Sequence, residues 1–295
     1  DPTEDVRQVA FSADAKLFAS AARENSVFVY HTATWLIVAN LTHHDRPVQD
    51  VSFRIEPGEM VGFLGANGAG KTTYFNLIAG TFPPSSGQVF LANEDITGLK
   101  PYQLFHKGLL RTFQIAHEFT NLTVVENLMM VPAGQPGEQL WDAWFNRAKV
   151  LTHEKAVRKK AEEVLEFLNL NHLIDELAGN LSGGQKKLLE LGRTMMVDAK
   201  IVLLDEVGAG VNRTLLNEIG EAIIQLNKEK GYTFCMIEHD MDFISRLCDP
   251  VVVMAEGQFL TSGTAEEVKN NEEVIEAYLG TGLKNKANGQ EATSS

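Results

Sequence analysis

The sequence predicts an α/β fold with a mixed-sheet core, a helical subdomain and a further β segment at the N-terminus. From about residue 47, short apolar strands alternate with helical stretches, and Met60–Leu64 is a nearly continuous apolar run typical of a buried parallel strand. The same alternation returns after residue 181, with apolar runs at 201–204 and 233–237 that are each followed by an acid. With 44% hydrophobic residues, a chain of 295 residues can build a sizeable core.

The first 45 residues follow a different pattern. Apolar residues alternate with polar ones there, as in short strands, at Val6, Val9, Phe11, Val27 and Val29. The string VRQVAFSADAKLFASAARENSVFVYHTAT resembles one WD-type β-propeller repeat. A single repeat cannot close a propeller, so we do not expect a propeller-type binding site. We therefore expect an atypical β segment at 1–45, a main domain at 46–283 and a small, polar, disordered tail at 284–295.

The middle of the main domain, about residues 101–182, is predicted to be helical. Apolar residues recur there at helical spacing, at Val157, Ala161, Val164, Leu165 and Leu168. The stretch 130–153 has no clear periodicity and is interpreted as an ordered insertion. Further along, Glu256-Gly257 is typical of a hairpin turn between strands at 251–254 and 259–261.

Composition and charge argue against several classes of protein. The formal net charge is −13, whereas a protein that mainly binds nucleic acid has a basic excess, so we expect no nucleic-acid partner. No apolar run approaches the roughly 20 residues that span a bilayer, and no charged region leads into an apolar stretch at the start, so we expect no secretory signal. Cys235 and Cys248 are interpreted as reduced, partly buried thiols of a cytosolic protein.

Residues 65–72 read GANGAGKT and lie between the buried strand at 60–64 and a predicted helix. In this context the glycines let backbone N–H groups turn inward and bind phosphate at a helix N-terminus. Lys71 would reach the β- and γ-phosphates, and the Thr72 hydroxyl would ligate Mg²⁺. A glycine-rich turn without a ligand is the alternative. The candidate nucleotide-binding residues are Gly65, Ala66, Asn67, Gly68, Ala69, Gly70, Lys71, Thr72 and Thr73.

Two carboxylates follow the apolar run at 201–204. A buried strand delivers its last residues to the carboxyl edge of the sheet, where open α/β sheets bind ligands. Asp205 is positioned to hold Mg²⁺ through water, and Glu206 to orient or activate an attacking water. A solvated turn is the alternative, and it would be preferred if the phosphate loop were missing.

A second glycine motif, LSGGQ, occupies residues 181–185 and precedes a helical stretch. Ser182, Gly183, Gly184 and Gln185 can form another site for phosphate oxygens at a helix start. A helix cap with flexible glycines is the alternative, because serine is a good N-cap residue.

These motifs, together with RTFQ at 111–114 and IEHD at 237–240, resemble the ABC ATPase family, whose signature is LSGGQ. The resemblance covers about residues 47–282 and implies a cassette of the P-loop NTPase class that takes ATP and Mg²⁺ as cofactors. It implies catalytic roles for Glu206, His239, Lys71 and Gln114, and metal-binding roles for Thr72, Gln114 and Asp205. Taken alone, His239 would be interpreted as a structural or surface histidine.

The resemblance also implies partners. Two such ATPase subunits, identical or paralogous, would close face to face, with ATP between Gly65–Thr73 of one and Ser182–Gln185 of the other. Strings such as NLTVVENLMM, GGQKKLLELGR and VIEAYLG are similar to the ATPase subunits of branched-chain amino-acid importers. That subgroup implies membrane permease subunits, indirect coupling to an extracytoplasmic solute-binding protein and a peripheral place at the cytoplasmic face of the membrane.

Several alternatives to this function remain open. Urea and short-chain amide importers and the ATPase of lipopolysaccharide export are similar in sequence. A soluble ABC ATPase acting in translation or DNA repair would usually carry two cassettes or a long coiled coil. A binding module built on the N-terminal repeat is disfavoured because only one repeat is present.

The sequence departs from the family pattern at three places. Val207 follows the acid pair where the family has proline. Thr42 occupies the position of the aromatic residue that stacks on adenine, so His43, His44 or Tyr30 would have to substitute. The family's usual N-terminal β segment is not recognisable, and the WD-like segment stands in its place.

Overall fold

The computed structural model describes residues 8–11, 17–22, 26–31, 37–42, 51–112, 118–136, 144 and 146–277, with side chains from residue 53 onward. It confirms the predicted α/β fold with a mixed-sheet core and a helical region. The predicted strand at Met60–Leu64 and the predicted helix start at Lys71 are both confirmed.

The described part of the chain contains a central six-stranded sheet in the order β13-β12-β6-β11-β10-β9. Its strands pair in parallel, except that β13 runs antiparallel to β12. The strands are β6 (Met60–Leu64), β9 (Leu109–Arg111), β10 (Ile201–Asp205), β11 (Phe234–Ile237), β12 (Val251–Ala255) and β13 (Gln258–Gly263). The last two form the predicted hairpin around Glu256-Gly257.

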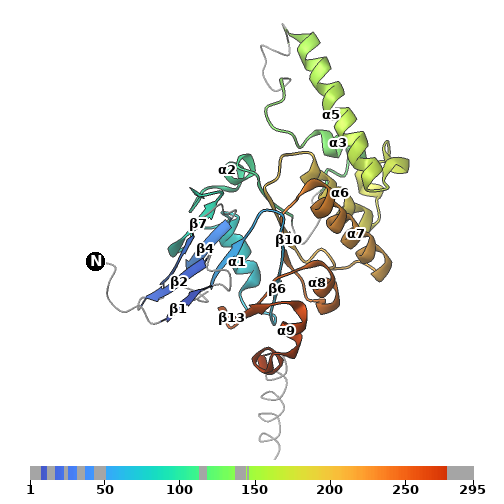
Figure 1. Cartoon of the computed structure of the whole chain (residues 1–295). Coiled ribbons are helices and arrows are strands. Elements are labelled where there is room, and N and C mark those ends of the chain that lie inside the picture. The colour runs from blue at the N-terminus through green and yellow to red at the C-terminus, as the bar shows by residue number, and fades with distance from the viewer. Residues whose placement is uncertain are drawn as a thin grey trace, which may run out of the picture.

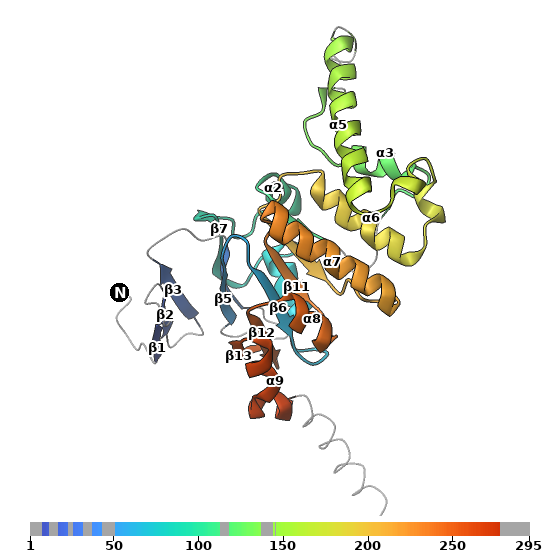
Figure 2. The same ribbon diagram turned by 45° about the vertical axis from the view of Figure 1, so that its right-hand side comes forward.

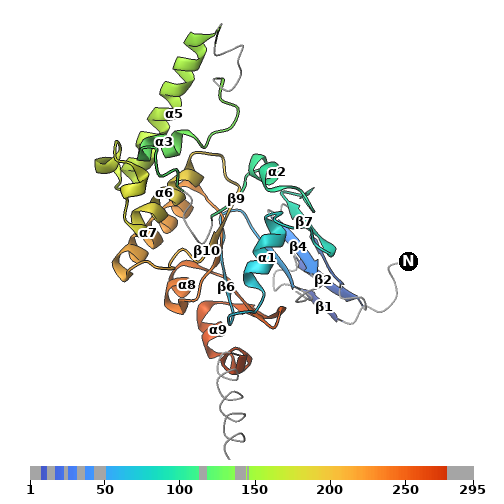
Figure 3. The ribbon, with the colours of Figure 1, turned by 180° about the vertical axis from the view of Figure 1, so that it is seen from behind.

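Helices cover both faces of this sheet, which is why its inner strands are apolar along their whole length. One face packs on α1 (Lys71–Ile78), whose Tyr74 and Phe75 are fully buried. The other face packs on α6 (Gly183–Met195), α7 (Arg213–Lys230) and α8 (Met241–Leu247). Figure 1 shows α1 on one side of β6 and β10, with α6, α7 and α8 on the other, and Figure 3 shows the α1 side from behind.

A second, antiparallel sheet lies beyond α1, in the order β5-β4-β7-β8. Its strands are β4 (Ile37–Thr42), β5 (Val51–Ile55), β7 (Ser86–Leu91) and β8 (Glu94–Asp95). The sequence-based boundary at residue 45 assigns β4 to the N-terminal segment. Its pairing with β5 and β7 places it in the same sheet as strands of the main domain.

The N-terminal strands β1 (Gln8–Phe11), β2 (Leu17–Ala22) and β3 (Ser26–His31) form a separate antiparallel sheet. These are the short strands that the alternating pattern predicts. The predicted tail at 284–295 lies outside the described residues.

The helical region contains α3 (Val124–Met129), α5 (Arg147–Phe167) and α6, with α2 (Pro101–His106) before it and two short 3₁₀ turns, Asn171–Leu173 and Ala178–Asn180, between α5 and α6. The predicted helical spacing is confirmed, since Val157, Ala161, Val164 and Leu165 form the buried stripe of α5. The first turns of α5 project away from the rest of the molecule in both Figure 1 and Figure 2. Helix α9 (Ala265–Asn270) follows the hairpin.

Cys235 and Cys248 are free, as predicted, and are buried rather than partly buried; burial raises the pKa of both thiols. Among the described helices, none has the length and apolar character to cross a membrane.

Candidate functional site

The phosphate-loop motif lies between β6 and α1, at the carboxyl edge of the central sheet. Gly65, Gly68 and Gly70 have φ values of 155°, 85° and 93°, which a side chain would strain. A Cβ on Gly65 would lie 2.3 Å from the Met254 carbonyl oxygen, so the strand β12 leaves room only for glycine. The sequence folds into this loop because glycine occurs where the backbone must turn.

Lys71 begins α1 and folds back over the loop. Its Nζ donates hydrogen bonds to the carbonyl oxygens of Gly65 at 2.6 Å and Ala66 at 3.2 Å. Burial lowers the pKa of Lys71, and the charges of Glu206 and Asp205 oppose that shift. The ammonium group is therefore already positioned for an anion that binds at the loop.

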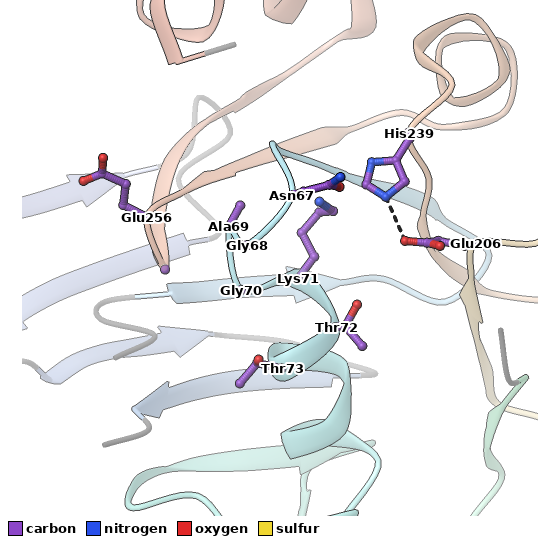
Figure 4. A pocket seen from close by; sticks show the side chains of 11 residues that line it. Asn67, Gly68, Ala69, Gly70, Lys71, Thr72, Thr73, Glu206, His239 and Glu256 are labelled. Carbon is purple, nitrogen blue, oxygen red and sulfur yellow. Dashed lines mark hydrogen bonds and ion pairs between the residues drawn. The ribbon is translucent and has the colours of Figure 1, made fainter. Parts of the chain in front are cut away.

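A cavity of about 420 Å³ opens above the loop. Figure 4 shows Lys71, Thr72 and Thr73 along one side, Glu206 and His239 on the opposite rim, and Glu256 at the hairpin tip. The described residues that line it are Asn67, Gly68, Ala69, Gly70, Lys71, Thr72, Thr73, Glu206, His239, Glu256 and Gly257. Motifs more than 160 residues apart in sequence therefore meet in one cavity, as the resemblance implies.

Glu206 and His239 face each other across the ends of β10 and β11. Glu206 Oε1 and His239 Nε2 are 2.7 Å apart, with the side chains 19% and 44% exposed. Glu206 has φ 50°, an uncommon conformation for a residue with a side chain, and its N–H donates to the Ile237 carbonyl oxygen at 2.9 Å. The carboxylate is thus aimed into the cavity and paired with an imidazole that can exchange a proton.

Asp205 ends β10 and is buried beside a cation that sequence reasoning missed. Arg111 Nη2 donates to Asp205 Oδ2 at 2.8 Å, and the other end of the guanidinium, Nη1, donates to Asn76 Oδ1. Arg111 ends β9, the parallel neighbour of β10. A buried carboxylate at a strand end requires a partner. The arginine that begins the string RTFQ was the sequence feature that could have indicated this partner.

The second glycine motif caps α6 and does not line the cavity around Lys71. Ser182 Oγ accepts from Gln185 N at 3.4 Å, and Gln185 Oε1 accepts from Ser182 N at 2.9 Å, a capping box. A Cβ on Gly184 would lie 1.4 Å from Leu215 Cδ2, so this glycine allows α6 and α7 to approach closely. A Cβ on Gly183 would meet no atom of another described segment within 4 Å. Gln114 lies outside the described residues.

Comparison with known proteins agrees with this geometry. Residues 48–209 match the family model described as ABC transporter, and residues 260–284 match that of the branched-chain amino acid ATP-binding cassette transporter. A probable branched-chain amino acid transport ATP-binding protein, LivG, of Archaeoglobus fulgidus is 40% identical over 230 residues, covering 78% of this chain and 88% of the relative. The high-affinity LivG protein of Escherichia coli K12 is 34% identical, covering 79% and 91%.

Solved structures give the same assignment. The ADP conformation of an ATP-binding cassette of an ABC transporter superposes with a TM-score of 0.71 at 34% identity, covering 84% of this chain and all of the other. A nucleotide-free cassette from an ABC transporter superposes with a TM-score of 0.70 at 36% identity, covering 83% and 99%. With the phosphate loop, the paired Glu206 and His239 and the LSGGQ helix in place, the chain belongs to the ATP-binding cassette family of ABC transporters.

Proposed function

We propose that this chain is the ATP-binding and ATP-hydrolysing subunit of an importer for branched-chain amino acids. The observation that carries the proposal is the cavity in which the phosphate loop, Glu206 and His239 meet. The matches to relatives named for branched-chain amino acid transport, and to that subgroup's C-terminal model, support the choice of solute class.

The phosphate loop is the binding site for the ATP triphosphate in this proposal. Backbone N–H groups at the start of α1 bind the phosphate oxygens, and the α1 dipole favours their negative charge. Lys71 supplies a full positive charge to the β- and γ-phosphates once its Nζ exchanges the carbonyl oxygens of the loop for phosphate.

Two oxygen-bearing side chains at the carboxyl edge of the central sheet fit a magnesium ion. Thr72 offers a hydroxyl at the start of α1 and Asp205 a carboxylate at the end of β10, and oxygen ligands are those that Mg²⁺ prefers. Among the described residues there is no cage of three or more acidic, His or Cys side chains, and Mg²⁺ in such sites is held by few protein groups together with substrate phosphates. When bound, Mg²⁺ supplies neutralisation of charge on the β- and γ-phosphates. Gln114 completes the proposed ligand set.

Glu206 is the proposed group that orients the attacking water. Its carboxylate lines the cavity, whereas the Asp205 carboxylate is hydrogen-bonded to Arg111, and Asp205 is not among the described residues that line the cavity. His239 is hydrogen-bonded to Glu206. In this proposal it also contacts the γ-phosphate, so that the pair holds the water and the phosphate in line.

The proposed active form is a face-to-face pair of ATPase subunits. The start of α6, with Ser182, Gly183 and Gly184, is a helix N-terminus that lies apart from the cavity around Lys71, so it can serve the nucleotide of a second subunit. In the proposed assembly the pair binds permease subunits at the cytoplasmic face of the membrane and is coupled through them to a solute-binding protein.

Uptake of labelled leucine tests the function. Cells of the source organism that lack the gene should take up leucine at the parental rate when the chain is restored, and not when the Glu206→Gln variant is restored at equal abundance. The proposed solute class would be contradicted if the deleted strain took up leucine normally and instead lost either urea uptake or lipopolysaccharide export.

A further inference from the structure

The loop after Glu206 and the segment that carries His239 are joined by more than the contact between those two side chains. Glu206 N donates to the Ile237 carbonyl oxygen, and two residues further on Gly208 N donates to Glu238 Oε1 at 2.7 Å. One backbone hydrogen bond and one hydrogen bond from backbone to side chain thus flank the Glu206–His239 pair.

Glu238 accepts from both segments at once. Its Oε1 takes the Gly208 N–H, and its Oε2 takes the His239 N–H at 3.3 Å. The residue is 5% exposed. Burial raises the pKa of this carboxyl, and the two backbone hydrogen bonds oppose the shift. A buried carboxylate is costly unless it is hydrogen-bonded, so both oxygens are kept on these N–H groups. The bond to Gly208 N joins the two segments, and the bond to His239 N fixes the carboxylate against the residue that follows it.

Gly208 packs next to the Glu238 carboxylate. A Cβ on Gly208 would lie 3.4 Å from Oε1 and 3.5 Å from Oε2 of Glu238, and 3.2 Å from Leu216 Cδ1. An added side chain would thus be tight against Leu216 and in ordinary van der Waals contact with the carboxylate. Val207, the preceding residue, is 7% exposed and packs into the core, which fixes the same loop from the other side.

We infer that Glu238 is a positioning residue for hydrolysis, one that sets the relative placement of Glu206 and His239 by holding the Gly208 and His239 backbones on its two oxygens. The inference rests on the proposed function. Glu238 is not among the residues that line the cavity around Lys71, so it acts on the chemistry through its neighbours and not by touching nucleotide.

The placement predicts a split between turnover and binding. Glu238→Met keeps an unbranched side chain of similar length but removes both acceptors. By analogy with groups that orient metal ligands, kcat for ATP should fall by about 10-fold to 100-fold. KM and the dissociation constant for ATP should change by less than about twofold, because the phosphate loop is untouched.

The glutamine variant distinguishes positioning from simple support of the fold. Glu238→Gln keeps one oxygen for the shorter bond to Gly208 N and loses the longer one to His239 N, so it should recover most of the lost kcat. Glu59 supplies a matched control. It accepts the Glu56 N–H at 2.7 Å and is partly buried, and burial raises its pKa. It directly precedes β6, at the end of that strand away from the phosphate loop. Glu59→Met should leave kcat unchanged.

Steady-state ATP hydrolysis and nucleotide titration of the full-length chain, with its partner subunits where these are needed for turnover, make the test. A low kcat with unchanged KM in the Met variant, and recovery in the Gln variant, supports the inference. A Met variant with parental kcat, or one that loses ATP binding in parallel, overturns it. If the Met variant does not fold, Glu238→Asp replaces it, because the shorter side chain withdraws the carboxylate from Gly208 N. Parental kcat in the Asp variant then overturns the inference.

The same experiment separates this inference from the proposed function. If the parent chain and its assembly hydrolyse no ATP, the proposed function fails. If the parent hydrolyses ATP and Glu206→Gln does not, while Glu238→Met is as active as the parent, only the role of Glu238 fails.

Discussion

Arg111→Met should destabilise the folded chain, because it leaves the buried Asp205 carboxylate without its guanidinium partner. The Nη2–Oδ2 distance is 2.8 Å, and the two side chains are 12% and 4% exposed. Methionine keeps most of the length and apolar surface of the arginine stem, so the change removes mainly the charge and its hydrogen bonds.

The expected loss is about 3 kcal/mol in the free energy of unfolding. Removing one partner of a buried pair costs about 3–5 kcal/mol. We use the lower end of this range because Asp205 also interacts electrostatically with Lys71. That interaction opposes the lowering of the Lys71 pKa by burial. For roughly 240 residues that unfold together, the entropy of unfolding is about 0.5 kcal/mol per degree, so Tm should fall by about 6 °C.

Thermal unfolding without nucleotide measures this loss. Lys159→Met is the matched control, because Lys159 and Glu163 form an ion pair at 3.7 Å with side chains 79% and 63% exposed, and such surface pairs contribute about 0–1 kcal/mol. The double variant Arg111→Met/Asp205→Asn should recover part of the loss, since no unpaired charge stays buried. A Tm drop no larger than that of Lys159→Met, or a double variant as unstable as the sum of the single ones, would refute the reasoning.

Three further predictions concern the nucleotide and the core. Lys71→Ala should abolish tight ATP binding in a titration with a fluorescent ATP analogue, because the charge facing the β- and γ-phosphates is lost; unchanged affinity would exclude the loop as the site. Thr42→Tyr should tighten ATP in the same titration, by about 1–3 kcal/mol if the ring stacks on adenine as aromatic residues stack on bases, and an unchanged Kd would mean another side chain serves the base. Gly62→Ala should lower the unfolding free energy by about 1–3 kcal/mol in denaturant titration, since its Cβ would meet Ile244 Cγ2 at 2.8 Å and Cys248 Cβ at 3.1 Å; full stability would show that α8 can move aside.

The sequence was sufficient to predict those parts of the site that depend on local context. The loop at 65–72 could be placed because a continuous apolar run precedes it and a helix follows, and Glu206 because it directly follows a buried strand. Parallel strands end at one edge of a sheet, so His239 after β11 also belonged there.

Contacts between distant segments could not be predicted in this way. Arg111 meets Asp205 only because β9 lies beside β10, and Glu238 meets Gly208 only because β11 lies on the other side of β10. Local hydrophobicity does not tell which sheet a strand joins, so the boundary at residue 45 left β4 in the N-terminal segment although it pairs with β5 and β7. The capping box at Ser182 was one of two interpretations, and a cap does not exclude a role at a second subunit's nucleotide.

The rate of ATP hydrolysis by the Glu206→Gln variant tests the central claim most directly. Glutamine keeps the size of the side chain but cannot accept a proton from water, so turnover with Mg²⁺ should fall by about 10²–10⁴-fold, while ATP still binds and gel filtration with ATP and Mg²⁺ shows a trapped dimer. Near-parental turnover by this variant, with ATP bound as tightly as by the parent, would remove Glu206 from the chemistry and contradict the account of the site.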